Sequence, residues 1–325
     1  MLPLRSMAKL VTLCVALALS SAALAQSYPS KPIRFIVPDG PGSVSDLRAR
    51  QLGTKLSEQM RQPVVIDNRS GGSFIIGAEA AAKSPADGYT IFLGSIVTHS
   101  LNPLLFKSLP YRPNEDFIPV TLLSAGPMIL VASPSVPATN LRQLIDLSKA
   151  KPNQLGYGVV GLGSPGHLVM EQIKRETGAK FLMVPYKSSG TYIQDLMGGH
   201  LPVTLSYWSI VGPAVNSGKL RALAVAAPHR LEAAPDVPTF ADAGVPGIEG
   251  YGWQGIFVPA GTSPVLVARL QIEIASAINS PEIRGQMIDS GADPGGNTPE
   301  QFAAMIRADQ AKWRRLAGQV DLAKQ

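Results

Sequence analysis

Residues 33–60 read IRFIVPDGPGSVSDLRARQLGTKLSEQM and contain a strand, a glycine-rich loop and a helix in succession. The run Ile33–Val37 is short and rich in branched apolar residues, as in a buried strand. Helical periodicity then extends from Asp46 to Met60. A strand followed by a loop and a helix is the repeating unit of a parallel sheet that is covered by helices.

The same alternation continues along the chain. Further strands are predicted at residues 64–67, 90–93, 155–159, 181–184, 203–206 and 220–226. Helices are predicted at residues 76–83, 141–149, 168–177, 192–197, 213–217, 264–278, 281–290 and 299–316. The expected fold class is therefore α/β, with mainly parallel sheets flanked by helices.

Two segments interrupt the alternation and indicate two domains. Phe117–Ala132 and Pro246–Pro259 are longer, apolar and contain Gly and Pro, and we interpret them as the two crossings between domains. A chain of this length also exceeds the size at which single hydrophobic cores stop growing. Domain 1 is predicted to comprise residues 26–123 and 252–325, and domain 2 to comprise residues 124–251.

The N-terminus has the pattern of a secretory signal peptide. Arg5 and Lys9 precede the apolar run Leu10–Leu19, and Ala23–Ala25 supplies an A-x-A cleavage site. A transmembrane anchor is the alternative, but the run is too short to span about 30 Å of hydrocarbon. We predict that residues 1–25 are removed after Ala25 and that the remaining chain is periplasmic.

Cysteine content and charge limit the chemistry of the exported chain. The only cysteine, Cys14, lies within the signal, so neither disulfides nor thiolate chemistry remain. The formal charge of +6 falls to +4 because Arg5 and Lys9 leave with the signal. The cations are scattered apart from Lys312–Arg315 on an amphipathic helix, so we expect no nucleic-acid partner. A mildly basic exported protein is suited to anionic solutes.

Three loops that follow predicted strands have the composition of ligand sites. In open parallel sheets, ligands bind beyond the carboxyl ends of strands, where helix N-termini present backbone N–H groups. The first loop supplies the candidates Gly40, Pro41, Gly42, Ser43 and Asp46. Glycine lets the backbone approach a solute closely, and Ser43 and Asp46 have capping-box spacing. Asp46 either only caps the helix or also meets the ligand through a water.

The other two loops contribute hydroxyl groups and a helix N-terminus. They supply the candidates Ser95, Thr98, Val160, Gly161 and Ser164. Ser164 is predicted to be an N-cap, with proline at the first helical position, so that free N–H groups face the cleft. Each such helix end favours an anion by about 0.3–2 kcal/mol.

A nucleotide site is the alternative interpretation of the third loop. Gly161, Gly163 and Gly166 form the pattern G-x-G-x-x-G between a predicted strand and a predicted helix. A dinucleotide fingerprint also needs an acid at the end of the next strand, and that strand ends in Val184-Pro185-Tyr186-Lys187 instead. We therefore expect no dinucleotide cofactor.

The same loops carry two residues that also occur in catalytic sites, a histidine and a serine. His99 is a conceivable base, but no positioned nucleophile accompanies it, and a structural or solvent-facing histidine is the simpler interpretation. Ser164 and His167 are not part of a G-x-S-x-G elbow. The four histidines are far apart in the sequence, without zinc-site spacing. The sequence therefore favours a binding protein without metal or cofactor over an enzyme.

Several ordered motifs resemble the substrate-binding receptors of tripartite tricarboxylate transporters, the Bug family. The similarity extends over nearly the whole exported chain. The motifs are Tyr28-Pro29-Ser30-Lys31-Pro32-Ile33, Pro41-Gly42 with Asp46, Gly77-Ala78-Glu79, Pro85-Ala86-Asp87-Gly88-Tyr89-Thr90, Asn102-Pro103, Gly163-Ser164-Pro165, Val184-Pro185-Tyr186-Lys187, Gly218 to Val225, Pro235-Asp236-Val237-Pro238-Thr239 and Pro259-Ala260-Gly261-Thr262.

The resemblance implies a two-domain clamshell of the type II periplasmic-binding-protein kind. It implies a monomer that closes on a small carboxylate and delivers it to integral membrane permease subunits. In the family, the loop matching Pro38–Asp46 contacts a carboxylate partly through waters, and the loops matching Gly94–Thr98 and Gly161–Ser164 complete the site. A ligand sensor that docks to a signalling protein, and an enzyme on the same scaffold, are the alternatives.

The sequence departs from the family pattern where ligand identity is decided. Asp39 and Ser43 stand where an apolar residue and a second glycine are usual, and Val159-Val160 replaces small hydroxylated residues. Ser206 and Tyr207 are further candidate ligand residues, in a segment that commonly carries Asp in relatives.

A serine at the end of that strand cannot neutralise an ammonium group, whose unpaired burial costs several kcal/mol. We therefore predict an amine-free mono- or dicarboxylate, aromatic acids included. Tyr207 and Trp208 either stack on the solute or pack between the domains.

Overall fold

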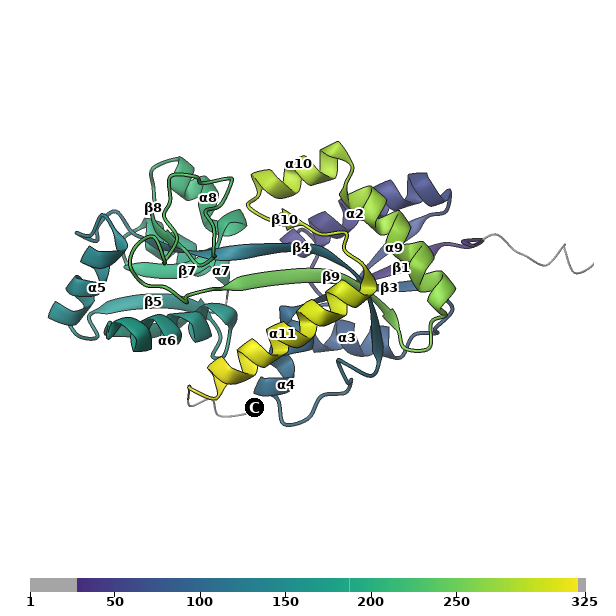
Figure 1. Ribbon diagram of the computed structural model, residues 1–325, viewed down its shortest axis with the longest axis horizontal. Coiled ribbons are helices and arrows are strands. Elements are labelled where there is room, and N and C mark those ends of the chain that lie inside the picture. The colour runs from purple at the N-terminus through teal and green to yellow at the C-terminus, as the bar shows by residue number, and fades with distance from the viewer. Residues whose placement is uncertain (1–27, 187, 321–325) are drawn as a thin grey trace, which may run out of the picture.

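The computed structural model describes residues 28–186 and 188–320 of the chain (Figure 1). The predicted signal peptide, its cleavage site at Ala25 and Cys14 lie outside these residues. Seven strands and eight helices lie close to their predicted limits, and a ninth predicted helix, at residues 213–217, overlaps only the end of a helix that begins at Trp208. The elements are β1 (Ile33–Val37), α2 (Val44–Met60), β2 (Val64–Asn68), α3 (Ile75–Ala82), β3 (Thr90–Ser95), the π-helix η1 (Val97–Leu101), α4 (Asn102–Leu105), β4 (Phe117–Ala132), α5 (Leu141–Ala150), β5 (Leu155–Val160), α6 (Pro165–Thr177), β6 (Phe181–Tyr186), α7 (Ser189–Met197), β7 (Val203–Tyr207), α8 (Trp208–Asn216), β8 (Arg221–Val225), β9 (Tyr251–Pro259), α9 (Pro264–Ile278), α10 (Pro281–Asp289), β10 (Asp293–Pro294) and α11 (Pro299–Ala317).

The strands form one mixed sheet in the order β2-β1-β3-β9-β4-β7-β5-β6, with β8 and β10 also paired to β4. The predicted parallel pairing is confirmed at both ends, because β1 is parallel to β2 and β3, and β5 is parallel to β6 and β7. The two predicted crossing segments are themselves strands. β4 and β9 are antiparallel to each other and occupy the centre of the sheet.

Strand β4 joins the two halves of the molecule. Residues Phe117–Pro127 pair with β9, whereas Met128–Ala132 pair with β7 and β8. The pairing with β9 shifts register after Pro119 and again after Leu122, which bends the long strand. Figure 1 shows β4 and β9 running from one half to the other, with α11 lying across them. We keep the predicted domain limits, 26–123 with 252–325 and 124–251, as a proposal.

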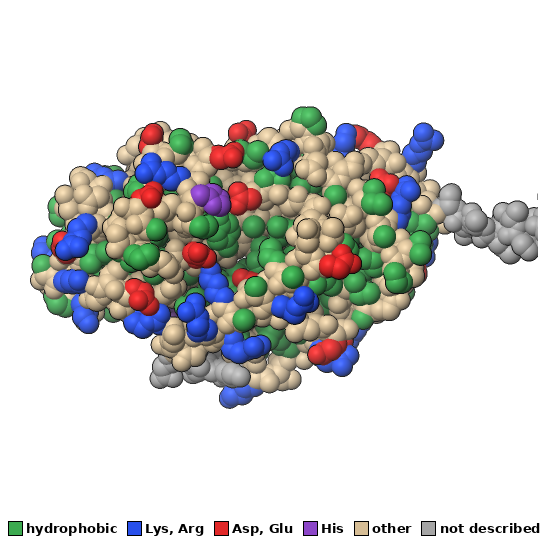
Figure 2. Space-filling model, in the orientation of Figure 1, with side chains coloured by type: hydrophobic (Ala, Val, Ile, Leu, Met, Phe, Trp, Pro, Cys, Tyr) green, Lys and Arg blue, Asp and Glu red, His purple; other side chains and the backbone are tan. Residues whose placement is uncertain are grey.

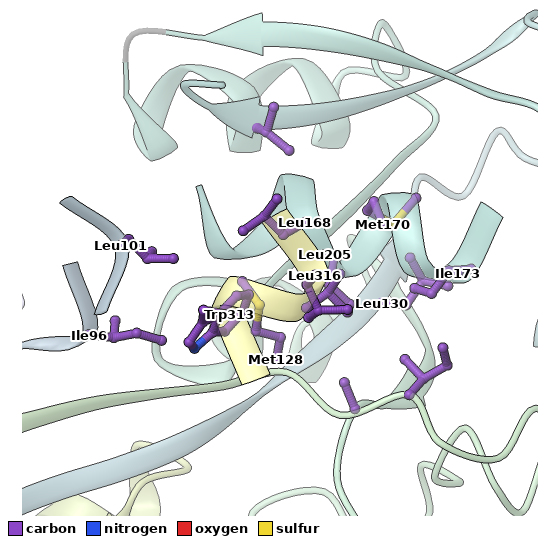
Figure 3. Packing of buried hydrophobic residues seen from close by; sticks show 14 of the residues in the cluster. Ile96, Leu101, Met128, Leu130, Leu168, Met170, Ile173, Leu205, Trp313 and Leu316 are labelled. Carbon is purple, nitrogen blue, oxygen red and sulfur yellow. The ribbon is translucent and has the colours of Figure 1, made fainter. Parts of the chain in front are cut away.

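Helix α11 brings both halves into one hydrophobic core. It begins with a capping box, because the Thr298 side chain accepts from the Gln301 amide and the Gln301 side chain accepts from the Thr298 amide. Trp313 is fully buried and shares a cluster with Met128 on β4 and Leu168 on α6. Figure 3 shows Trp313 and Leu316 directed toward these side chains.

The basic segment on α11 is the exposed face of this helix. Arg314 and Arg315 are exposed and directly follow the buried Trp313, whereas Lys312 before it is half-buried. Figure 2 shows Lys and Arg side chains distributed among Asp and Glu over one face of the molecule, with hydrophobic side chains between the two halves. Within residues 28–186 and 188–320, none of the helices has the length and apolar character needed to span a membrane.

Candidate functional site

A cavity of about 440 Å³ lies between the two halves of the molecule. One half contributes side chains from the start of α3, from η1 and from α4, and the other contributes the carboxyl ends of β5 and β7 and the first turns of α6, α7 and α8. This is the place at which α/β sheets bind ligands, and the volume suits a small molecule.

Three candidates from the third loop line this cavity, namely Val160, Gly161 and Ser164. Gly161 has φ of 86° and Gly163 has φ of 77°, which is the left-handed region that favours glycine. Ser164 is the N-cap of α6 and Pro165 follows at the first helical position, as predicted. The Ser164 hydroxyl is buried but makes no cap bond and has no other partner in the described residues. A buried hydroxyl at the cavity wall thus has an unused hydrogen-bonding capacity.

Ser206 and Tyr207 at the end of β7 also line the cavity. Ser206 is buried, and its hydroxyl lies 2.8 Å from the hydroxyl of Tyr192 on α7. The Tyr207 ring lies against Gly252 on β9, and burial raises the pKa of its phenol, so the side chain stays neutral.

Trp208 is not part of the lining. It is 4% exposed and packs against Gly291, which belongs to the other half. Tyr207 and Trp208 were expected either to stack on the solute or to pack between the domains, and Trp208 packs between the two halves. Tyr207 combines both positions, because it contacts β9 and faces the cavity.

The first loop is built around the carboxylate of Asp46. Its Oδ2 accepts hydrogen bonds from the Gly42 amide at 2.8 Å and from Arg50 Nε at 2.9 Å, and its Oδ1 accepts from Asn68 Nδ2 at 2.9 Å. The bond from Arg50 is the main cause that lowers the pKa of Asp46 to about 2. Ser43 caps α2 by accepting from the Asp46 amide at 3.1 Å.

The five candidates of this loop are not in the lining of the cavity. Gly40, Pro41 and Gly42 are partly or fully exposed, with open space around both glycines, and Ser43 and Asp46 serve the start of α2. The predicted contact of these residues with a ligand remains a prediction.

Ser95 and Thr98 of the second loop are also outside the lining. The segment forms the π-helix η1, which turns the Thr98 side chain inward, where its hydroxyl bonds the Ser95 amide at 2.9 Å and His99 Nδ1 at 2.8 Å. Val97 of the same turn lines the cavity instead. The ligand role of Ser95 and Thr98 likewise stays a prediction.

His99 is a structural residue and not a catalytic base, in agreement with the simpler interpretation of the sequence. It is 1% exposed, and its ring stacks on Phe257 with centroids 3.9 Å apart. Burial lowers the pKa of His99 to about 3, so the ring is neutral. A buried neutral ring outside the cavity lining cannot act as a base on a bound solute.

Sequence reasoning missed the apolar part of the lining. Phe74 holds φ of 70° at the N-cap of α3, and Leu105 and Phe106 end the short helix α4. The only available signal was the motif Asn102-Pro103. Asn102 is fully buried, lines the cavity and donates from Nδ2 to the Ser73 carbonyl at 2.9 Å.

The described part of the cavity wall carries no charged side chain. Its lining, as far as the chain is described, contains no Asp, Glu, Lys, Arg or His side chain. Helices α6 and α7 begin at its wall, so their first N–H groups supply partial positive charge. In the described part of the chain, no cluster of three or more His, Cys, Asp or Glu side chains could hold a metal ion.

Two α/β halves that face each other across this cavity define a two-domain solute-binding clamshell. Comparison with known proteins agrees with this class. Residues 48–322 match the model of the "Tripartite tricarboxylate transporter family receptor". The chain belongs to this family of solute-binding receptors.

Individual relatives cover almost all of the chain. Protein BugT of Bordetella pertussis is 37% identical over 294 residues, which are 89% of each chain. A solved R. palustris protein with adipate is 36% identical with a TM-score of 0.82, over 90% of this chain and 97% of that one. MatC from Rhodopseudomonas palustris with bound malate is 28% identical with a TM-score of 0.77, over 89% and 100%.

Proposed function

We propose that this receptor captures a small carboxylate in the periplasm and delivers it to the membrane subunits of a tripartite tricarboxylate-type transporter. The single observation that carries the carboxylate assignment is the start of α6 at the cavity wall, where Ser164 and Pro165 line the cavity and the Ser164 hydroxyl has no hydrogen-bond partner in the described residues. Donors without competing anions stabilise a carboxylate by hydrogen bonding and by the helix dipole. The similar structures with adipate and malate support this assignment.

The solute is proposed to be free of amino groups. The described lining contains no carboxylate that could pair with an ammonium group. The Ser206 hydroxyl already pairs with the hydroxyl of Tyr192. Burial of an unpaired ammonium costs several kcal/mol, which excludes amino acids from a tight site. The apolar surface from Phe74, Leu105 and Tyr207 suits an alkyl or aromatic body.

The receptor is proposed to release its solute unchanged. No acid or base is present in the described lining, and His99 is buried against Phe257. Incubation with adipate followed by mass spectrometry checks this point, since any new product would indicate turnover.

The proposed export predicts a chain that begins at Gln26 without lipid, which the intact mass of the periplasmic protein checks.

A thermal-shift panel tests the proposed solute class. Adipate, malate, benzoate, glutamate and aspartate are added separately to the purified protein, because a ligand that binds only the folded state raises Tm. We expect at least one amine-free acid to raise Tm, and glutamate and aspartate to leave it unchanged. A rise with the two amino acids alone would refute the assignment.

A further inference from the structure

The ring of His167 holds the backbone of the loop that carries Ser164. His167 lies in the first turns of α6 and is 4% exposed. Its Nδ1 accepts a hydrogen bond from the Gly163 amide at 3.0 Å. Gly163 adopts φ of 77°, between Gly161 and Ser164, and both of these neighbours line the cavity.

This bond defines the protonation state of the ring. An imidazole nitrogen that accepts a hydrogen bond carries no proton, so the proton of the neutral ring is on Nε2. Nε2 lies 4.0 Å from Glu171 Oε1. That carboxylate oxygen already accepts from the Tyr157 hydroxyl at 2.6 Å and from Lys174 Nζ at 2.8 Å. A second proton on the ring would displace the Gly163 amide.

The surroundings of the ring keep it neutral near neutral pH. Burial lowers the pKa of His167, Glu171 opposes this shift, and Lys174 adds to it. The other titratable groups belong to elements packed on α6. These groups include Tyr157 on β5, Tyr207 at the end of β7, and Arg307, Asp309, Lys312, Arg314 and Arg315 on α11.

The held loop also contacts the opposite half of the molecule. The Leu105 side chain on α4 occupies the space that a Cβ at Gly163 would need. The Gly163 backbone is therefore fixed from two sides, by His167 within its own half and by Leu105 across the cavity. A shift of this residue would move Gly161 and Ser164 together.

We propose that His167 is a positioning residue of the solute site, whose unprotonated Nδ1 fixes the Gly163 amide and thereby orients Gly161 and Ser164 toward the solute. The inference rests on the proposed function. It makes solute affinity dependent on the neutral ring: affinity is retained near neutral pH and falls in acid, when Nδ1 gains a proton and can no longer accept.

The test compares wild type with His167→Asn and His167→Ala by calorimetry. The probe is whichever of adipate, malate and benzoate raises Tm most. An Asn side chain retains an acceptor close to the position of Nδ1 but does not titrate. Because burial lowers the pKa of His167 below the ordinary value of about 6.5, the titrations extend from about pH 7.5 down to about pH 4. Over this range we expect wild-type affinity to fall three- to tenfold more than that of His167→Asn. At neutral pH, we expect His167→Ala to bind the probe about three- to tenfold more weakly than wild type, and His167→Asn to bind it with wild-type affinity. Equal pH profiles of wild type and His167→Asn would overturn the proposal.

A second measurement does not depend on the solute. Ring ¹⁵N shifts of the solute-free protein report the tautomer, and hydrogen exchange reports protection of the Gly163 amide. We expect the Nε2–H tautomer and a protected amide that exchanges faster in His167→Ala. An Nδ1–H tautomer, or an unprotected amide, would overturn the positioning role even if no acid bound. Failure of every acid in the panel, with the expected tautomer observed, would count against the proposed function alone.

Discussion

Ser164 and Ser43 both precede helices, but they have different roles: Ser164 is proposed to bind the solute, and Ser43 caps its helix. Ser164 makes no cap bond and its hydroxyl has no partner in the part of the chain that the structure describes, whereas Ser43 caps α2 and lies outside the cavity lining. We expect Ser164→Ala to weaken binding of the best acid of the panel about tenfold, because one hydrogen bond to an anion is lost. Calorimetry measures the affinity, and denaturant unfolding measures the stability.

Ser43→Ala is the matched control for that substitution. It should lower the free energy of unfolding by about 1 kcal/mol through loss of the cap and leave the affinity unchanged. Weaker binding by Ser43→Ala would instead support the predicted ligand role of the first loop. Unchanged binding by Ser164→Ala would show that the third loop does not hold the carboxylate.

Asp46 makes stability depend on pH at this end of β1. Because the folded-state pKa of Asp46 is lowered to about 2 from 3.8, its ionised form stabilises the fold above about pH 4, and this contribution is lost as pH falls toward 2. Asp46→Asn should therefore lower the free energy of unfolding by about 1–2 kcal/mol at neutral pH, through weaker bonds to Gly42 and Asn68.

The difference between Asp46→Asn and wild type should shrink between about pH 4 and pH 2. Urea unfolding at several pH values measures it. A difference that stays constant over this range would show that Asp46 acts through shape and not through its charge.

Part of the site could be predicted from residue types. Ser164 was found because serine before proline marks a helix start, and Ser206 because it ends a strand. Thr98 has the right chemistry, but η1 turns its hydroxyl inward, and a single π-turn leaves no clear periodicity in sequence. Leu105 and Phe74 could not be distinguished from core residues, because an apolar side chain gives the same signal in either place.

At the scale of elements, α11 connects the two halves through Trp313. This side chain is fully buried, and its Nε1 donates to Asp309 Oδ1 at 2.8 Å. Trp313→Ala should lower the free energy of unfolding by about 3–5 kcal/mol, because it leaves a large cavity and an unpaired acceptor. Arg314→Ala, on the exposed side of the same turn, is the control and should stay within about 0.5 kcal/mol. Guanidinium unfolding measures both, and similar values for the two variants would contradict the role of α11.

Most helices were predictable because each buries one face with a helical period, and most strands because they are short apolar runs that are buried on both faces. Pro264–Ile278 was predicted with its exact limits, since proline marks its first turn and apolar residues recur along it. The pairing of β4 with β9 was not predictable. These segments are joined through contacts more than a hundred residues apart, and nothing local in their sequences specifies the partner.

At the scale of the whole molecule, the site exists only where the two halves meet. Its walls come from α3, η1 and α4 on one side and from β5, α6 and β7 on the other (Figure 1). Such a cavity could not be read from any one segment, and the family resemblance supplied what local patterns did not. In the proposed function, helix ends and hydroxyl groups, and no charged side chain of the described lining, stabilise the carboxylate once water is excluded.

The most direct test of the account is calorimetric titration of adipate, malate and benzoate into wild type, Val160→Trp and Val65→Trp. Val160 lines the cavity and is 42% exposed, so tryptophan fills the site without disturbing the core, whereas Val65 is 53% exposed on β2, away from the cavity. We predict that wild type and Val65→Trp bind at least one of these acids with the same affinity and that Val160→Trp binds it at least about tenfold more weakly. Equal affinity of all three proteins would show that the solute does not occupy this cavity.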